Sequence, residues 1–265
     1  MVIKMQFIAS FLLIKCYNNY GDYMSYKDYF VIDNIAANPT YLRIILDEIV
    51  NVYEQCGAKF DFKWKIIRTW VGLNPQFLPS HNENLCDEIH LAINDSRYWC
   101  LVVYQLSHEL HHLFAYIHAS RSNYVIRWVE ELVCEAISYY FLKYFSDNYF
   151  NSNLYKYDNN YGHYFTEYIN SIAFNSGNGK LKSVRGYQEL LKFEETVYTN
   201  RENHHNEVYE LFTLIDQNSL IPLLNIKNYY DISKHLIITS ALLRDYGYIP
   251  AIRYICDLQD NILKH

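Results

Sequence analysis

Two long stretches of the chain, residues 98–118 and 124–145, contain neither glycine nor proline. Five small or polar residues, 119–123, separate them and are typical of a turn. In the first stretch, apolar side chains recur at the spacing of one buried helical face: Leu106, Leu110, Leu113 and Phe114. The sequence therefore predicts two consecutive helices, and the other elements must pack around this pair.

The segments before this pair predict a small sheet and one helix. Residues 29–33, 63–71 and 88–94 are typical of strands, and residues 74–84, which include two prolines, are typical of a loop. Between the first two strands, residues 38–55 predict an amphipathic helix that ends before Gly57.

The segments after the pair are less regular. Residues 146–187 are rich in Asn, Tyr, Ser and Gly and predict surface loops or a mobile cover. Residues 203–263 predict several short helices. We therefore expect an α+β fold, in which a small N-terminal sheet packs on the helix pair and a mainly helical C-terminal lobe follows, with the cleft between them.

The chain has 265 residues but only 8 Gly and 5 Pro, so there is little material for flexible linkers. We expect one domain, residues 1–265, with lobes at 24–145 and 146–265. Residues 1–23 form an uncertain leader or extra segment. Their apolar run after Lys4 resembles part of a signal peptide, although a buried strand or short helix is the simpler interpretation, and Met24 is an alternative start.

Composition limits the partners and the compartment. The net charge is −6 and no dense Lys/Arg run occurs, so we expect no nucleic-acid partner. No segment reaches about 18 uninterrupted apolar residues, so we expect no transmembrane segment. The six cysteines form no CxxC pair, which favours a reducing, cytoplasmic compartment; secretion is the alternative if residues 1–23 act as a signal peptide.

The first predicted helix contains the sequence His108-Glu109-x-x-His112, which is the HExxH pattern of zinc peptidases. Residues four apart lie on one helical face, so both imidazoles can converge on one zinc ion. Glu109 would then lie beside the metal, where it could accept a proton from the attacking water and pass it to the leaving amine. The pattern predicts a site with one Zn²⁺ per chain.

A catalytic zinc usually has a third protein ligand, and the second predicted helix offers three carboxylates: Glu130, Glu131 and Glu135. With this helix, residues 89–140 resemble the gluzincins, the zinc peptidases that include thermolysin-like and aminopeptidase-N-like enzymes. The resemblance implies a zincin-like active-site helix pair and a ligand Glu on the second helix. Trp128-x-x-Glu131 resembles the Trp-x-x-Glu motif of the aminopeptidase-like enzymes, so Glu131 is the preferred ligand.

The other two carboxylates keep alternative roles. Glu135 resembles the family's carboxylate that orients a ligand histidine, here His108. Glu135 itself remains an alternative ligand, because Glu135-Ala136-Ile137-Ser138 resembles the sequence around the ligand Glu of thermolysin-like enzymes. Glu130 should point roughly 100° away from Glu131 and is the weakest choice.

The resemblance also implies a downstream Tyr or His that stabilises the oxyanion. We expect His204 and His205 in this catalytic role, with Tyr124, Tyr187 and Tyr198 as alternatives. His111 could replace His112 as a ligand but is more simply a neighbouring or surface histidine, and His90 is more simply structural. Residues 88–94 could hold a peptide substrate as an added strand, or could simply pair within the sheet.

These features predict a zinc-dependent metallopeptidase that acts on a peptide or protein substrate. The Gly-x-Met-Glu-Asn segment, by which aminopeptidase-like gluzincins hold a free amine, is absent, which favours an endopeptidase. The alternatives are a non-catalytic zinc-binding or interaction protein that keeps the fold, and a helical protein whose histidines form a polar seam. The sequence leaves the oligomeric state open.

Overall fold

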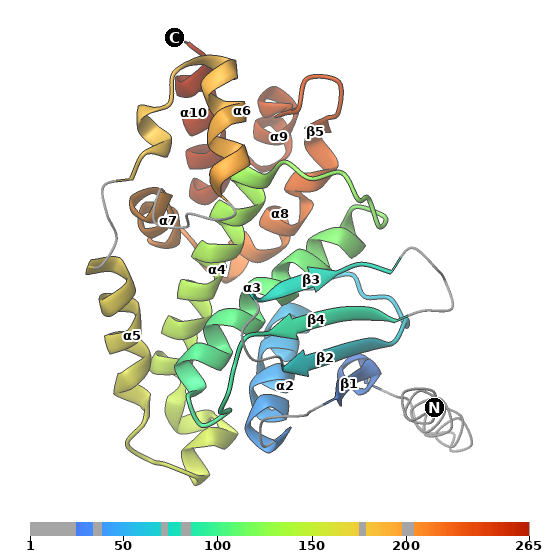
Figure 1. Ribbon diagram of the computed structural model, residues 1–265, viewed down its shortest axis with the longest axis vertical. Helices are drawn as coiled ribbons and strands as arrows, with labels where there is room; N and C mark the ends of the chain where they lie inside the picture. Colours follow the sequence, from blue (N-terminus) through green and yellow to red (C-terminus); the bar gives the residue numbers. More distant parts are fainter. Residues whose placement is uncertain are drawn as a thin grey trace.

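The computed structural model describes residues 25–33, 39–69, 74–80, 86–174, 179–197 and 204–264. The expected α+β class is confirmed, and helices predominate (Figure 1). The helices are α2 (Pro39–Gln55), α3 (Trp99–His118), α4 (Arg127–Asp147), α5 (Gly162–Phe174), α6 (Gly186–Val197), α7 (His205–Phe212), α8 (Leu220–Asn225), α9 (Thr239–Tyr246) and α10 (Pro250–Leu263). The strands are β1 (Phe30–Asp33), β2 (Lys65–Thr69), β3 (Gln76–Leu78), β4 (Asp87–Leu91), β5 (Tyr230–Asp231) and β6 (Leu236–Ile237).

The main sheet has the strand order β1-β2-β4-β3. β1, β2 and β4 are parallel, with Ile67 of β2 opposite Ile89 of β4, whereas β3 runs antiparallel to β4. Side chains along β2 alternate between buried and half-buried, as expected for a sheet with one covered face. The helices α2 and α3 lie beside this sheet (Figure 1). β3 is therefore an edge strand of the described sheet, and it contacts α3.

The predicted helix pair is present as α3 and α4, and the two helices pack closely together. Their connection turns sharply, because Ser120 and Arg121 both adopt positive φ, at 51° and 63°. The Arg121 guanidinium forms ion pairs with Asp61 and with the fully buried Asp87 at the start of β4. These ion pairs tie the α3–α4 turn to the sheet and so help to fix both helices.

The C-terminal elements cover the sides of the pair that the sheet leaves open. α5, α6 and α7 pack on α4, and α8 packs on α3. α10 packs against α9, α6 and α7. One cluster of buried apolar side chains runs from the sheet through α3 and α4 into α8 and α10. The helix pair thus lies at the centre of the core, with a layer on each side (Figure 1).

Several predicted boundaries were wrong. The expected loop at 74–84 contains β3, because these three residues find backbone partners on β4. The expected loops of 146–187 include α5, whose Phe165 is fully buried, and the start of α6. The β5–β6 hairpin was not predicted. The proposed leader at 1–23 lies outside the described residues.

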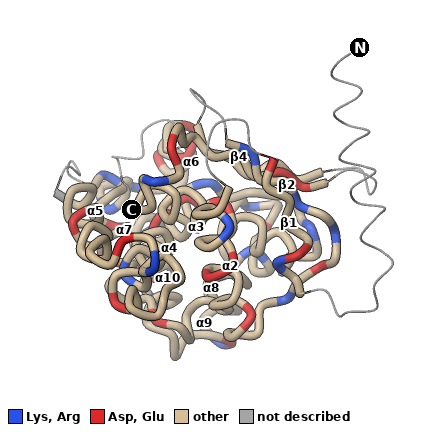
Figure 2. Tube along the Cα trace, turned by 90° about the horizontal axis from the view of Figure 1, so that it is seen from below, with Lys and Arg blue, Asp and Glu red and all other residues tan. Residues whose placement is uncertain are grey.

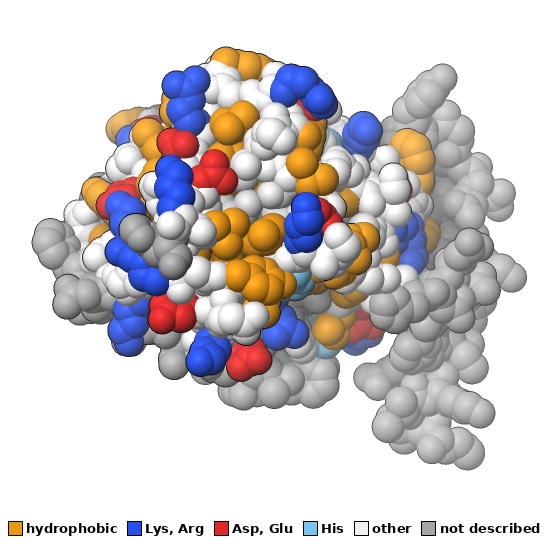
Figure 3. All heavy atoms as spheres, turned by 90° about the horizontal axis from the view of Figure 1, so that it is seen from above, with side chains coloured by type: hydrophobic (Ala, Val, Ile, Leu, Met, Phe, Trp, Pro, Cys, Tyr) orange, Lys and Arg blue, Asp and Glu red, His pale blue; other side chains and the backbone are white. Residues whose placement is uncertain are grey.

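The described residues bear on the expected absence of a transmembrane segment and of a basic surface. None of the helices that the structure describes is both long and apolar enough to cross a membrane. Acidic and basic residues are interspersed along the described trace in Figure 2. On the face shown in Figure 3, lysines and arginines alternate with apolar and acidic side chains and form no continuous basic surface.

Candidate metal centre

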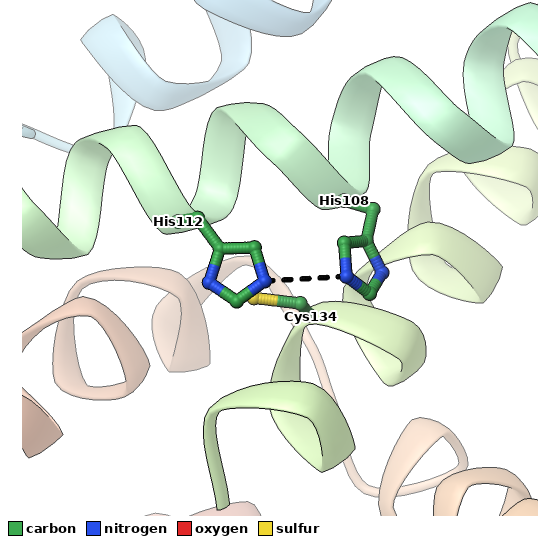
Figure 4. Close-up of side chains that lie close together, drawn as sticks. All are labelled: His108, His112 and Cys134. Atoms are coloured by element: carbon green, nitrogen blue, oxygen red, sulfur yellow. Dashed lines mark hydrogen bonds between the residues drawn. The ribbon is translucent and has the colours of Figure 1, made fainter. Parts of the chain in front are cut away.

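α3 brings two histidines together on the face that it turns toward α4. The Nε2 atoms of His108 and His112 lie 3.2 Å apart, as expected for residues one helical turn apart (Figure 4). His108 is 2% exposed, and His112 is half-buried. The two imidazole nitrogens therefore face a common point between the helices.

Glu131 of α4 lies at the same point. One carboxylate oxygen is 3.4 Å from His108 Nε2, and the other is 3.6 Å from His112 Nε2. A tetrahedral zinc ion with bonds of 2.0–2.1 Å to such ligands requires roughly 3.3 Å between donor atoms. The two Nε2 atoms lie 3.2 Å apart, and each has one oxygen of the Glu131 carboxylate at 3.4 or 3.6 Å, which is close to that value. The residues present therefore fit a metal ion.

Cys134 is a further donor that the sequence analysis did not select. His108, His112 and Cys134 could together hold a metal ion, because their ligand atoms all lie within 4.8 Å of one another (Figure 4). Cys134 follows Glu131 by three residues, so both face α3 from the same side of α4. This spacing of three residues is the feature of the sequence from which Cys134 could have been identified as a candidate ligand. Burial raises the pKa of the Cys134 thiol to about 12, so the thiol is protonated at neutral pH unless a metal displaces the proton.

The cluster favours positive charge at its centre. Burial alone would lower the pKa of His112, but Cys134, Glu130 and Glu131 raise it well above its ordinary value. Burial raises the pKa of Glu131, but His108 and His112 hold it well below its usual range. The groups that stabilise a proton here would equally stabilise a metal cation.

The second ring nitrogen of His108 faces Glu135. Nδ1 of His108 lies 3.4 Å from one oxygen of Glu135, and the Tyr104 hydroxyl donates to the other oxygen. Glu135 is 1% exposed. It lies where the sequence places a carboxylate that orients His108, and this contact leaves Nε2 of the same ring directed at the cluster.

Glu130 occupies the corresponding position on His112. Its carboxylate lies 3.6 Å from His112 Nδ1, and its other oxygen accepts a hydrogen bond of 3.0 Å from Lys227. Lys227 lies in the 3₁₀ helix η8 (Ile226–Tyr229), 97 residues later in the sequence. Each imidazole of the pair thus has a carboxylate beside its outer nitrogen. From the sequence we expected Glu130 only as the weakest candidate ligand, and its contact with His112 was not predicted.

A cavity of about 210 Å³ opens onto the cluster. Glu109, which is 2% exposed, lines it together with the two histidines and Glu131. Its other walls include Phe77 of β3 and Lys227. The expected cleft therefore lies mainly between β3 and the helix pair, with a contribution from the C-terminal half. Glu109 and the side chains of the cluster thus face the same cavity.

The remaining candidate residues lie in other surroundings. His111 is buried, and its Nδ1 hydrogen-bonds to the Tyr53 hydroxyl at 2.9 Å, so it faces α2 rather than the cluster. His90 contacts Glu88 on the same strand at 2.8 Å. The Tyr124 hydroxyl hydrogen-bonds to His235 Nδ1 at 2.5 Å.

The two histidines that we expected to stabilise the oxyanion lie at the start of α7. His204 is buried against Phe193 of α6, and His205 is half-buried. Neither His204 nor His205 lines the cavity, and neither does Tyr187. Tyr198 lies outside the described residues. The oxyanion role of His204 and His205 stays a prediction that their position does not support.

Comparison with known proteins adds no assignment: no family model, no curated protein and no solved structure matches this chain.

The contact between Lys227 and Glu130 gives a first prediction. In Lys227→Met, Glu130 loses its buried cation and should hold the His112 ring less firmly. We expect zinc affinity to fall by about tenfold or more, as for other groups that orient metal ligands. Competition with a fluorescent zinc chelator measures the change. Lys143→Met is the matched control, because Lys143 pairs with Asp147 on the exposed side of α4. Unchanged zinc affinity in Lys227→Met would contradict the role of Glu130 in orienting His112.

Proposed function

We propose that this protein is a zinc-dependent peptidase in which His108, His112 and Glu131 hold the metal and Glu109 is the general base. The observation that carries the proposal is geometric. The Nε2 atoms of His108 and His112 lie 3.2 Å apart, each lies within 3.6 Å of a different oxygen of the Glu131 carboxylate, and Glu109 lines the same cavity. The HExxH spacing and its resemblance to gluzincins, stated above, support the same conclusion.

The bound zinc would act as a Lewis acid that lowers the pKa of a water molecule and polarises the substrate carbonyl. The side chains of the chain supply the remaining functions. Glu109 accepts the proton of the attacking water and then delivers it to the leaving amine. Glu135 and Glu130 hold the two imidazoles so that their Nε2 atoms stay directed at the same point.

The sheet suggests how a peptide would be held. β4, one of whose expected roles was to hold a substrate as an added strand, is paired on both sides, with β2 and with β3. β3 is the edge of the described sheet, and its residues Gln76 and Phe77 line the cavity. An extended peptide that adds to this edge would pass the cluster along its length. Such binding needs no free terminus and fits an endopeptidase.

One observation favours a second function, a structural metal site without catalysis. If Cys134 joins the two histidines and Glu131, four protein donors surround the metal, as in structural zinc sites, and no position stays open for water. Replacement of Cys134 by serine separates the two functions. The peptidase should keep its zinc in Cys134→Ser, whereas a closed site should lose most of its zinc affinity.

Metal removal tests the proposed activity. The purified protein should cleave internally quenched peptides from a mixed library, lose this activity after dialysis against a chelator, and regain it on addition of one equivalent of zinc. Mass spectrometry of the products should locate the cuts within the peptides rather than at their ends. Hydrolysis that survives complete chelation would contradict a zinc-dependent mechanism, and the absence of hydrolysis by zinc-loaded protein would favour the structural site.

A further inference from the structure

The charged groups that line the cavity are paired, with one exception. Glu131 faces both histidines, and Glu130 pairs with Lys227 at 3.0 Å. A bound divalent cation would offset the charges of Glu131 and Glu109. The exception is Arg127, whose side chain is exposed and lines the same cavity. Within the described part of the chain, no carboxylate lies within ion-pair distance of its guanidinium.

Arg127 is held in place by its backbone rather than by its side chain. It is the first residue of α4, and its backbone N–H donates to the carboxylate of the buried Glu194. The other oxygen of Glu194 contacts His235 Nε2 at 2.8 Å. These contacts fix the backbone at the start of α4, and the Arg127 side chain lines the cavity.

The position of Arg127 relates it to the cluster. Arg127 precedes Glu131 by four residues, so both lie on one face of α4, about 6 Å apart along the helix axis. An extended peptide advances about 3.3 Å per residue. A group that meets Arg127 would therefore lie within about two residues of the bond that faces the cluster.

The chemistry of the guanidinium defines that group. Arginine presents a planar set of donors that matches a carboxylate in a bidentate manner. The apolar side chains of Phe77 and Val125 line the same cavity. The net charge of the chain is −6, so the chain as a whole does not attract an acidic ligand, and a preference for one requires a local positive charge such as that of Arg127.

We propose that Arg127 binds a carboxylate of the substrate, which makes peptides with an acidic group within about two residues of the cleaved bond the preferred substrates of this site. The acidic group is an Asp or Glu side chain or a C-terminal carboxylate. This inference rests on the proposed function, because it assigns the substrate class of the same cavity.

The test measures binding, so that it does not depend on turnover. Zinc-loaded Glu109→Gln protein is titrated into fluorescently labelled octapeptide mixtures of three kinds, and the dissociation constants are measured by anisotropy. The first kind has Glu at one fixed position and an amidated C-terminus, the second has Gln at that position and the same amide, and the third has Gln and a free C-terminal carboxylate. Scanning the fixed position locates the preference.

We expect the Glu peptides to bind about three- to tenfold more tightly than the Gln peptides at one or two adjacent positions. The preference should disappear in Glu109→Gln/Arg127→Gln and persist in the matched control Glu109→Gln/Arg244→Gln, because Arg244 is exposed on α9 and pairs with Asp245. It should also weaken as salt is raised. If the free-carboxylate peptides alone bind more tightly, the acidic group is the C-terminus.

Equal affinities for all three kinds, a preference that survives Arg127→Gln, or no binding at all would overturn the inference. A failure of the proposed function is a different result. In that case the wild-type protein with zinc cleaves none of the peptides, although the preference for acidic peptides and its dependence on Arg127 are still measured in the Glu109→Gln background.

Discussion

Replacing Glu109 by glutamine should lower kcat for peptide hydrolysis by about 10²- to 10⁴-fold. Glutamine keeps the size and polarity of the side chain but cannot accept a proton from the attacking water. Glu109 lines the cavity beside His108, His112 and Glu131 and is not one of the three proposed ligands. Zinc content and KM should therefore change little. Initial rates on an internally quenched peptide, at matched zinc content, measure the effect.

Glu88→Gln is a suitable control, because Glu88 lies on β4 and does not line the cavity. This variant should retain the wild-type rate. If Glu109→Gln keeps most of its activity, the general base has been assigned to the wrong residue. If both variants lose activity and their melting temperatures fall, the loss reflects the fold rather than the chemistry.

Replacing Glu131 by alanine should remove zinc almost completely, whereas Glu135→Ala should retain it with lower affinity. Glu131 is the only carboxylate within 3.6 Å of both Nε2 atoms among the described ion pairs, while Glu135 contacts only Nδ1 of His108. The loss of a group that orients a ligand costs about 10- to 100-fold in metal affinity. The loss of a direct ligand costs more. Isothermal titration with zinc separates the two.

Thermal unfolding gives an independent measure of the same difference. A ligand present at about 100 times its dissociation constant stabilises a protein by about 2.7 kcal/mol. Zinc should therefore raise the melting temperature of the wild type and of Glu135→Ala but not that of Glu131→Ala. If zinc stabilises Glu131→Ala as much as the wild type, the third ligand is Glu135 or Cys134.

The helix pair could be predicted because local sequence and tertiary packing agree there. α3 and α4 lack glycine and proline, and both carry apolar side chains that the core needs on nearly every face. The proximity of His108 and His112 could be predicted for the same reason, since helical spacing alone brings them together. The choice of Glu131 among three carboxylates, and the approach of α4 to α3, came from the resemblance to gluzincins.

The features that were missed depend on contacts between distant segments. β3 has three residues between two prolines and becomes a strand only through its pairing with β4. α5 lies in a stretch rich in Asn and Tyr, and its buried side chains pack on α4. Lys227 reaches Glu130 from the other end of the chain. From helical geometry we expected Glu130 to point away from Glu131, but this geometry could not indicate that Glu130 would lie beside His112 Nδ1.

The zinc content of the purified wild-type protein, measured by inductively coupled plasma mass spectrometry after purification without chelators, tests the central claim most directly. We expect one zinc per chain, either as purified or after reconstitution and removal of excess metal. A protein that retains no zinc after reconstitution would show that His108, His112 and Glu131 form a polar contact between two helices, and the peptidase function would have to be abandoned.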